Sequence, residues 1–160
     1  MKRIFTLFAA LLLTFTAFAQ SGKSIYQKYS EAENVSAVYI SPAMFRLIGK
    51  IPDIEIEESS VNLSSLIRSL SGMYIINSEN RNINDNLRSE VERFIKGGSY
   101  ELLMEAKDNG EVVRMYTMGN AKTVTGFVML AVDGGEVTFI SLEGQMPRDE
   151  IEKALIEAAK

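Results

Sequence analysis

The chain has 160 residues, with 17 Lys and Arg against 21 Asp and Glu, and it contains no Cys, His or Trp. The missing Cys and His exclude disulfides, thiol nucleophiles, Ser-His-Asp triads and the usual zinc and haem sites. The acidic balance argues against a nucleic-acid partner and against electrostatic binding to anionic lipid. We predict no cofactor.

The first nineteen residues have the pattern of an export signal. Lys2 and Arg3 precede an apolar run over residues 4–18, and Ala17-Phe18-Ala19 supplies the small residues that signal peptidase recognises. The run is shorter than the roughly 20 residues that a helix needs to span a bilayer. We therefore predict cleavage between Ala19 and Gln20, a periplasmic or secreted protein, and no stable membrane anchor after cleavage. The alternative is an uncleaved N-terminal anchor.

Residues 20–160 are predicted to form a single α+β domain with a net charge of −6, from 15 basic and 21 acidic residues. Hydrophobic spacing and capping residues define the elements of its first half. The first two are a helix over Ser24–Asn34, capped by Ser24, and a strand over Val35–Ile40. A helix then begins at Pro42, with Ser41 as its N-cap and with Met44, Leu47 and Ile48 buried. The last two are a helix with Leu63, Leu66, Ile67 and Leu70 on one side, and a strand over Met73–Asn77.

A polar loop over Asn77–Asn86 is predicted next. Asn82 or Asn84 then caps a helix that buries Leu87, Val91 and Phe94, and that helix ends with Gly97 at its C′ position.

The second half is predicted to be a four-strand meander and a terminal helix. The strands are Ser99–Lys107, Glu111–Met118, Lys122–Val132 and Glu136–Leu142, and Pro147 opens a helix with Ile151, Ala154, Leu155 and Ala158 as its apolar stripe. Asp108-Asn109-Gly110, Gly119-Asn120 and Asp133-Gly134-Gly135 are the turns. The fold class is α+β, a largely antiparallel sheet built on this meander, with helices packed mainly on one face.

Strict alternation assigns the faces of two of these strands. It places Tyr100, Leu102, Met104 and Ala106 on one face of the first strand. In the third strand, which we place centrally, it groups Val124, Val128, Leu130 and Val132 against Phe127, Met129 and Ala131. Gly126 marks a bulge.

One acidic segment is the main candidate for chemistry. Asp53, Glu55, Glu57 and Glu58 alternate with apolar residues. They are weak candidates for a calcium site or for the carboxylate pair of a hydrolase, and a solvated acidic strand edge is the simpler interpretation.

Two other patterns are assigned structural roles, and a third has two interpretations. Met115 and Met118 have a spacing seen in copper sites, but on a strand they point to opposite faces. The Asp108–Gly110 and Asp133–Gly135 segments are turns rather than calcium loops. Tyr26, Tyr29 and Tyr39 form either an exposed aromatic patch or buried rings with wet hydroxyls.

Several segments together resemble the domain-of-unknown-function family 4252. They are Tyr26 and Tyr29 after an AFAQ cleavage site, VSAVYISPAMFRLIGKIP (residues 35–52), YELLM (100–104) before the Asp-Asn-Gly hairpin, and FVMLAVDGGEVTFISLEGQM (127–146). The resemblance implies a small exported envelope protein of Bacteroidota with no established activity, and a setting near extracytoplasmic-function sigma factors. Some relatives are lipoproteins, and this chain departs from them because it has no Cys.

These observations favour a non-enzymatic binding, interaction or envelope-stress accessory protein. Its expected partner is an envelope protein or a small ligand. The alternatives are a carboxylate-based hydrolase or a calcium-dependent module that uses residues 53–58, and a protein that adds its edge strand to another envelope protein.

Overall fold

The computed structural model describes residues 21–48 and 64–158. Its strands form one antiparallel sheet in the order β1-β2-β6-β5-β4-β3. The elements are α2 (Gly22–Tyr29), β1 (Val35–Ile40), α3 (Pro42–Ile48), α4 (Ser64–Ser69), β2 (Leu70–Ser78), α5 (Arg81–Gly97), β3 (Glu101–Asp108), β4 (Glu111–Gly119), β5 (Thr123–Asp133), β6 (Glu136–Pro147) and α6 (Arg148–Ala158). The predicted fold class and the predicted order of elements are confirmed.

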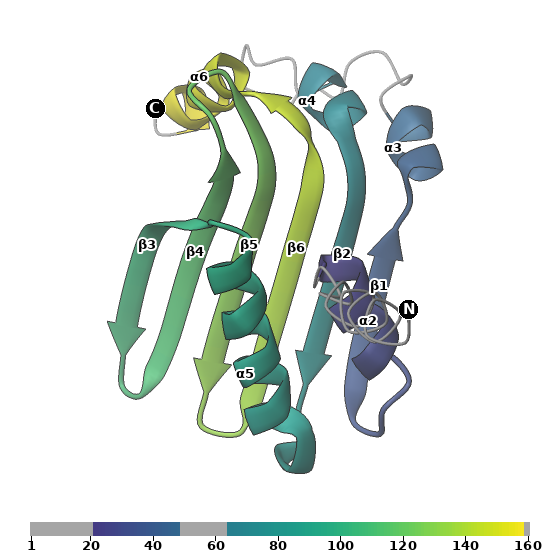
Figure 1. The fold of residues 1–160 in the computed structure, drawn as a ribbon, viewed down its shortest axis with the longest axis vertical. Coiled ribbons are helices and arrows are strands. Elements are labelled where there is room, and N and C mark those ends of the chain that lie inside the picture. The colour runs from purple at the N-terminus through teal and green to yellow at the C-terminus, as the bar shows by residue number, and fades with distance from the viewer. Residues whose placement is uncertain (1–20, 49–63, 159–160) are drawn as a thin grey trace, which may run out of the picture.

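The helices occupy two regions of the sheet. Helices α2 and α5 lie across one face, which we call the helix face, while α3, α4 and α6 gather at one end of the strands (Figure 1). We call the other face the opposite face. Strand β5 lies in the interior of the sheet, as its two apolar sides predicted. None of the described helices is long and apolar enough to cross a membrane.

The core lies between the helix face and α5. Phe139 of β6 and Val128 of β5 are completely buried against Leu87 and Val91 of α5. Phe94 packs edge-on against Phe139, with ring centroids 6.4 Å apart. The predicted apolar stripe of α5 is therefore confirmed, and its seven-residue spacing explains why one helix covers β5 and β6 together.

Helix α2 is fixed to this core by its cap and by a polar contact with α5. Ser21 is the N-cap, and its side chain and that of Ser24 bond reciprocally to each other's backbone N–H. The prediction of Ser24 as N-cap was wrong by one turn, because Ser24 is the third helical residue of this capping box. Tyr29 donates to buried Glu90 at 2.9 Å, and Lys28 pairs with the same carboxylate. Two elements distant in the sequence are thereby joined.

Other helix boundaries differ from the predicted ones, mainly where several polar residues could serve as the cap. Helix α2 ends at Tyr29 rather than Asn34, and Asn34 has a φ of 55°. Helix α5 begins inside the predicted polar loop because Asn80, rather than Asn82 or Asn84, is its N-cap. It ends at Gly97, with Gly98 as C-cap. Pro147 closes β6 instead of opening α6.

Two predictions near α3 and α4 were wrong about side chains. Ser41 caps α3 as expected, but Phe45 is its buried residue, while Met44 is 47% exposed and Leu47 is 63% exposed. Helix α4 stops at Ser69, so Leu70 begins β2 and Gly72 lies inside that strand. Phe45 is the buried residue of this seven-residue helix, so one aromatic side chain anchors α3 where a three-residue stripe was expected.

Three β-bulges interrupt the alternation of side chains in the described sheet. One lies in β2, where Ser71 is the extra residue between Leu70 and Gly72, and the other two lie in the meander of β3 to β6. In β3, Leu102 pairs with Tyr116 and Met104 pairs with Met115, so Leu103 is an extra residue. The predicted grouping of Leu102 with Met104 was therefore wrong, because a bulge reverses the alternation.

The second bulge of the meander lies in β5, where Gly126 predicted one. Val124 and Gly126 pair with successive β4 residues, so Thr125 is the extra residue. Val124 consequently shares the opposite face with Phe127 instead of joining Val128 on the helix face.

Candidate functional site

An apolar pocket lies between the opposite face of the sheet and the helices at its end. Its volume is about 460 Å³. The lining side chains are Leu66, Ile67, Leu70, Leu103, Thr117, Val124, Phe127, Leu142, Met146, Arg148, Ile151 and Glu152. Nine of these twelve residues are apolar, so the pocket is suited to a ligand with a hydrocarbon body.

Short helices form one wall of this apolar pocket. Leu66 and Ile67 come from α4, and Ile151 comes from α6. Ser65 of α4 donates to Glu150 of α6 at 2.5 Å, which ties the two helices together. The pocket therefore has a defined width although neither helix spans the sheet.

The two bulges of the meander complete the other wall. Leu103, the extra residue of β3, lies in the pocket beside Phe127, and the bulge in β5 turns Val124 toward the same space. Phe127 is flanked in register by Thr117 of β4 and Leu142 of β6. Without the bulges, alternation would direct Val124 toward α5 and remove it from this site.

Polar groups occur in the pocket at few positions. The Thr117 hydroxyl donates to the Gly126 carbonyl at 3.3 Å. Arg148 donates from Nε to the Asn120 carbonyl at 3.1 Å, which holds its guanidinium beside the β4–β5 turn. Glu152 lies one helical turn further along α6 and is exposed. Charge is thus confined to the part of the pocket that α6 borders.

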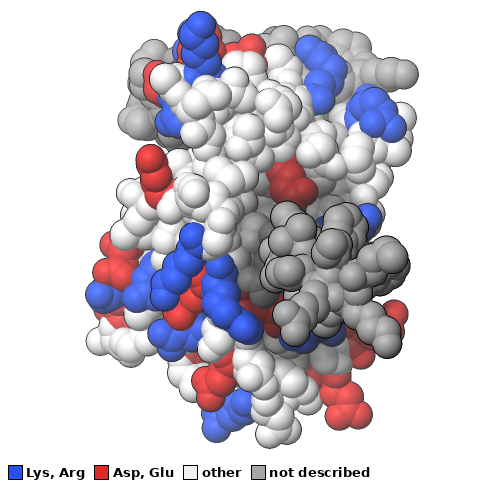
Figure 2. Space-filling model, in the orientation of Figure 1, with Lys and Arg blue, Asp and Glu red and all other residues white. Residues whose placement is uncertain are grey.

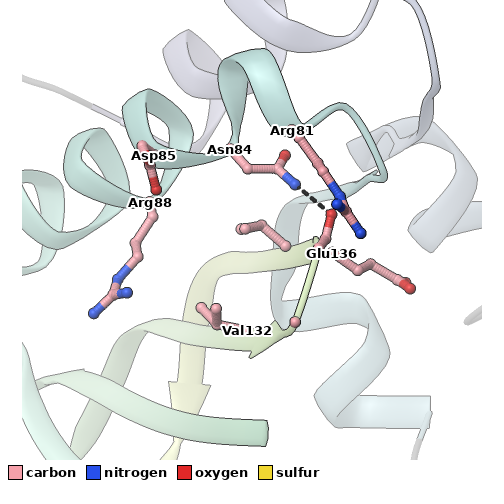
Figure 3. Close-up of a pocket in the computed structure, with 9 residues that line it drawn as sticks. Arg81, Asn84, Asp85, Arg88, Val132 and Glu136 are labelled. Carbon is pink, nitrogen blue, oxygen red and sulfur yellow. Dashed lines mark hydrogen bonds between the residues drawn. The ribbon is translucent and has the colours of Figure 1, made fainter. Parts of the chain in front are cut away.

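A second, polar pocket of about 240 Å³ lies where α5 begins, at the β5–β6 turn. Asn84 donates to the Gly135 carbonyl at 2.8 Å (Figure 3). It also accepts from Ser78 at 2.6 Å. Arg81 and Arg88 lie at opposite ends of this pocket and do not converge (Figure 3). Its buried amide therefore joins three elements, and its arginines do not form a shared anion site.

The charged residues of the helix face are mixed in sign. Figure 2 shows Lys and Arg interspersed with Asp and Glu over its lower half, where α5 lies. Arg88 pairs with Glu92 on α5, and Arg114 pairs with Glu105 across β3 and β4. The described part of this face consequently presents no broad field of one sign.

A partly buried carboxylate lies beneath the start of α2. Burial raises the pKa of Glu143, although the Gly22 N–H donates to it and Lys23 lies nearby. Burial, and then the charge of Glu143, raises the pKa of Tyr74 and of Tyr100 to about 12. All three groups therefore favour their protonated forms in the folded state.

Glu143→Gln is expected to stabilise the protein at pH 7. The folded state raises the pKa of Glu143, so the stabilising contribution of the protonated group is present below its ordinary pKa of 4.5 and is lost as pH rises through the folded-state value. Removing the charge should raise the melting temperature at pH 7 and change it less at pH 4.

Glu105→Gln is the matched control, because ion pairs with Lys107 and Arg114 lower the pKa of Glu105. Its contribution is present above the ordinary pKa and is lost as pH falls, so this variant should not gain stability at pH 7. Melting curves from pH 4 to 8 test both variants. A Glu143→Gln variant that is less stable at pH 7 than at pH 4, relative to the parent, contradicts the assignment.

The residues predicted as sites have different outcomes. Asp53, Glu55, Glu57 and Glu58 lie outside the described residues, as do Ala19 and Gln20 at the predicted cleavage site. Elsewhere in the described chain, no three acidic side chains are grouped to hold a metal ion.

The other assigned patterns lie in described strands and turns. The regular pairing of β4 places Met115 and Met118 on opposite faces, as predicted. Asn109 and Gly110 have φ values of 46° and 97° in a two-residue hairpin turn, which confirms their structural role.

The tyrosines separate into two environments. Tyr29 is buried and bonded to Glu90. Tyr26 and Tyr39 instead surround Tyr74, with Tyr39 stacked on it at 5.1 Å between ring centroids. The sequence did not indicate Tyr74 as the centre of this cluster. Tyr39 and Tyr74 meet because they are partners in the pairing of β1 with β2, and no local sequence pattern specifies that pairing.

Comparison with known proteins identifies the family. The model of the family described as "Domain of unknown function (DUF4252)" matches residues 29–154. No curated protein and no solved structure matches the chain. The match covers β1 to β6 and most of α6, including every residue that lines the apolar pocket. The chain belongs to the DUF4252 family.

Proposed function

We propose that this protein is an exported, non-enzymatic binding protein whose apolar pocket holds a small ligand with a hydrocarbon body. The observation that carries the proposal is the pocket of about 460 Å³ lined by aliphatic side chains and Phe127. Pockets that bind small molecules commonly measure about 300–1,000 Å³ and have mostly apolar walls. Of the two predicted partner classes, an envelope protein and a small ligand, this geometry favours the ligand.

The polar groups of the pocket favour binding over catalysis. The Thr117 hydroxyl already donates to a backbone carbonyl, and the whole chain has no His or Cys to activate it as a nucleophile. Arg148 and Glu152 lie on α6, away from Thr117 in the chain and one helical turn apart. These groups orient a ligand more readily than they transform one.

Export is supported by the first nineteen residues. A positive start, a short apolar run and an Ala-Phe-Ala cleavage site direct the chain out of the cytoplasm. Mass spectrometry of protein from a periplasmic extract should find an N-terminus at Gln20. A chain that keeps Met1 and remains in the membrane fraction would show an uncleaved anchor instead.

Leu142→Trp tests the pocket as the binding site. The indole is expected to fill space beside Phe127 and to raise the dissociation constant of a neutral apolar fluorophore, N-phenyl-1-naphthylamine, by about tenfold, which corresponds to the loss of roughly two buried methylenes of contact. Leu47→Trp is the matched control because Leu47 is exposed on α3 and does not line the pocket.

Fluorescence titration distinguishes the outcomes. The proposal expects tight binding by the parent and by Leu47→Trp, and weak binding by Leu142→Trp. Equal binding by all three proteins would place the fluorophore outside the pocket and contradict the proposal. Circular dichroism checks that the Trp variants keep the fold.

A further inference from the structure

We infer, on the basis of the proposed function, that the ligand of the apolar pocket is a free straight-chain aliphatic carboxylate whose carboxylate binds Arg148. The apolar walls match a hydrocarbon chain, and one charged group that the fold holds at a fixed place matches a carboxylate. The two ends of the ligand can therefore be tested separately.

Arg148 is positioned to bind an anion. Its Nε donates to the Asn120 carbonyl and its backbone N–H donates to the Lys122 carbonyl, so both the side chain and the start of α6 are fixed to the β4–β5 turn. No ion pair holds Arg148 among the described residues. Its remaining guanidinium N–H groups form the planar donor set that matches a carboxylate.

The other charged residue that lines the pocket, Glu152, does not offset Arg148. Glu152 also borders the pocket but is exposed, so water solvates its charge. Arg148 is less exposed and is anchored, and interactions at closer range dominate because salt screens charges beyond about 8 Å. The acidic balance of the whole chain therefore does not prevent an anionic head group from binding at Arg148.

The volume limits the length of the chain. A cavity of about 150 Å³ holds benzene, which has six carbons, so about 25 Å³ serves each heavy atom. At that ratio the pocket of about 460 Å³ accommodates roughly 18 heavy atoms. Laurate and myristate fit this limit, whereas a two-chain phospholipid exceeds it. We therefore expect a single free chain.

The test compares ligands that share a chain and differ at the head. Decanoate, laurate, dodecanol and dodecyltrimethylammonium are titrated, below their critical micelle concentrations, against the protein purified after export. Displacement of N-phenyl-1-naphthylamine is the signal. Laurate should bind about tenfold more tightly than dodecanol, because a charge-assisted hydrogen bond forms only with the carboxylate. Laurate should also exceed decanoate by roughly tenfold, since each added methylene contributes about a three- to fourfold gain.

Variants of Arg148 separate the head group from the chain. Arg148→Gln should remove the preference for laurate and leave dodecanol binding within about twofold, and Arg148→Lys should keep part of the preference. Arg93→Gln is the control, since Arg93 lies on α5 and, among the described residues, bonds to its own helix at the Ser89 carbonyl. Glu152→Gln should leave the order of the ligands unchanged.

Each outcome decides between the two proposals. Equal binding of laurate and dodecanol by the parent would overturn the carboxylate inference and leave the apolar pocket standing. Tightest binding of dodecyltrimethylammonium, lost in Glu152→Gln, would overturn it in favour of a cationic ligand. Failure of every ligand to displace a bound fluorophore would overturn the inference that the ligand is an aliphatic chain, whereas failure of the fluorophore itself to bind would overturn the proposed pocket function.

Discussion

Gly22→Ala is expected to reduce the free energy of unfolding by about 2–3 kcal/mol, because the new methyl group has no space. A Cβ at Gly22 would lie 2.3 Å from the Ser141 hydroxyl oxygen and 2.6 Å from Ser141 Cβ. Ser141 is completely buried in β6, and its hydroxyl is the one buried side-chain oxygen without a partner among the described residues. Helix α2 must therefore move away from the sheet and expose Ile25.

Two controls make the Gly22 result specific. Gly97→Ala adds the same methyl group to α5, where nothing lies within 4 Å, so the stability should be unchanged or slightly higher. Ser141→Gly removes the obstructing atoms, so Gly22→Ala should cost under about 1 kcal/mol in that background. Urea unfolding measures all five proteins, which are the parent, the three single variants and the Gly22→Ala/Ser141→Gly double variant. A Gly22→Ala variant as stable as the parent would show that α2 does not pack as described.

Phe139→Ala is expected to cost about 3–5 kcal/mol, the range for an aromatic side chain removed from a packed core. Phe139 is 0% exposed and meets Phe94 of α5 edge-on. Phe127→Ala is the matched comparison, because Phe127 is the partly buried aromatic residue on the opposite face. Phe127→Ala should reduce the free energy of unfolding by less than Phe139→Ala does, and it should also weaken ligand binding. Phe139→Ala should affect ligand binding only through its effect on stability.

Chemical denaturation of the two Phe variants distinguishes the two faces of the sheet. A larger loss for Phe127→Ala than for Phe139→Ala would contradict the placement of the core between the helix face and α5. A folded Phe139→Ala variant should still bind the fluorophore, since Phe139 does not line the apolar pocket.

The sequence predicted the architecture because local signals agreed with one another. The hairpin turn at Asn109 and Gly110 and the apolar faces of β5 and β6 specify neighbouring antiparallel strands. The spacing of Leu87, Val91 and Phe94 specifies the helix that covers them. Each signal operates over a few residues, so no long-range information is needed to find it.

The ends of helices were less predictable, because several residues offer the same cap. The Asn-rich segment before α5 contains alternative N-caps, and Asn80 is selected by tertiary contacts. Its side-chain amide donates to the Glu33 carbonyl at 2.9 Å, while Asn84 is used for the Gly135 carbonyl. Those partners lie 47 and 51 residues away in the sequence, beyond the reach of local capping rules.

The apolar pocket could not be predicted from alternation alone. Leu103 and Val124 enter it because each lies at a bulge that reverses the side of the strand on which later residues point. Gly126 indicated the second bulge, and three consecutive apolar residues, Leu102 to Met104, were an available signal for the first. The contributions of Leu66 and Ile151 depend on how α4 and α6 meet, which no local pattern specifies.

Methyl NMR tests the central claim most directly, which is that the apolar pocket binds a hydrocarbon chain. Titration with dodecanol should shift the methyl signals of Leu66, Ile67 and Ile151, which line the pocket from α4 and α6. The signals of Leu87 and Val91, buried between α5 and the helix face, should remain in place. Shifts confined to Leu87 and Val91, or no shift at any of these methyls, would contradict the account.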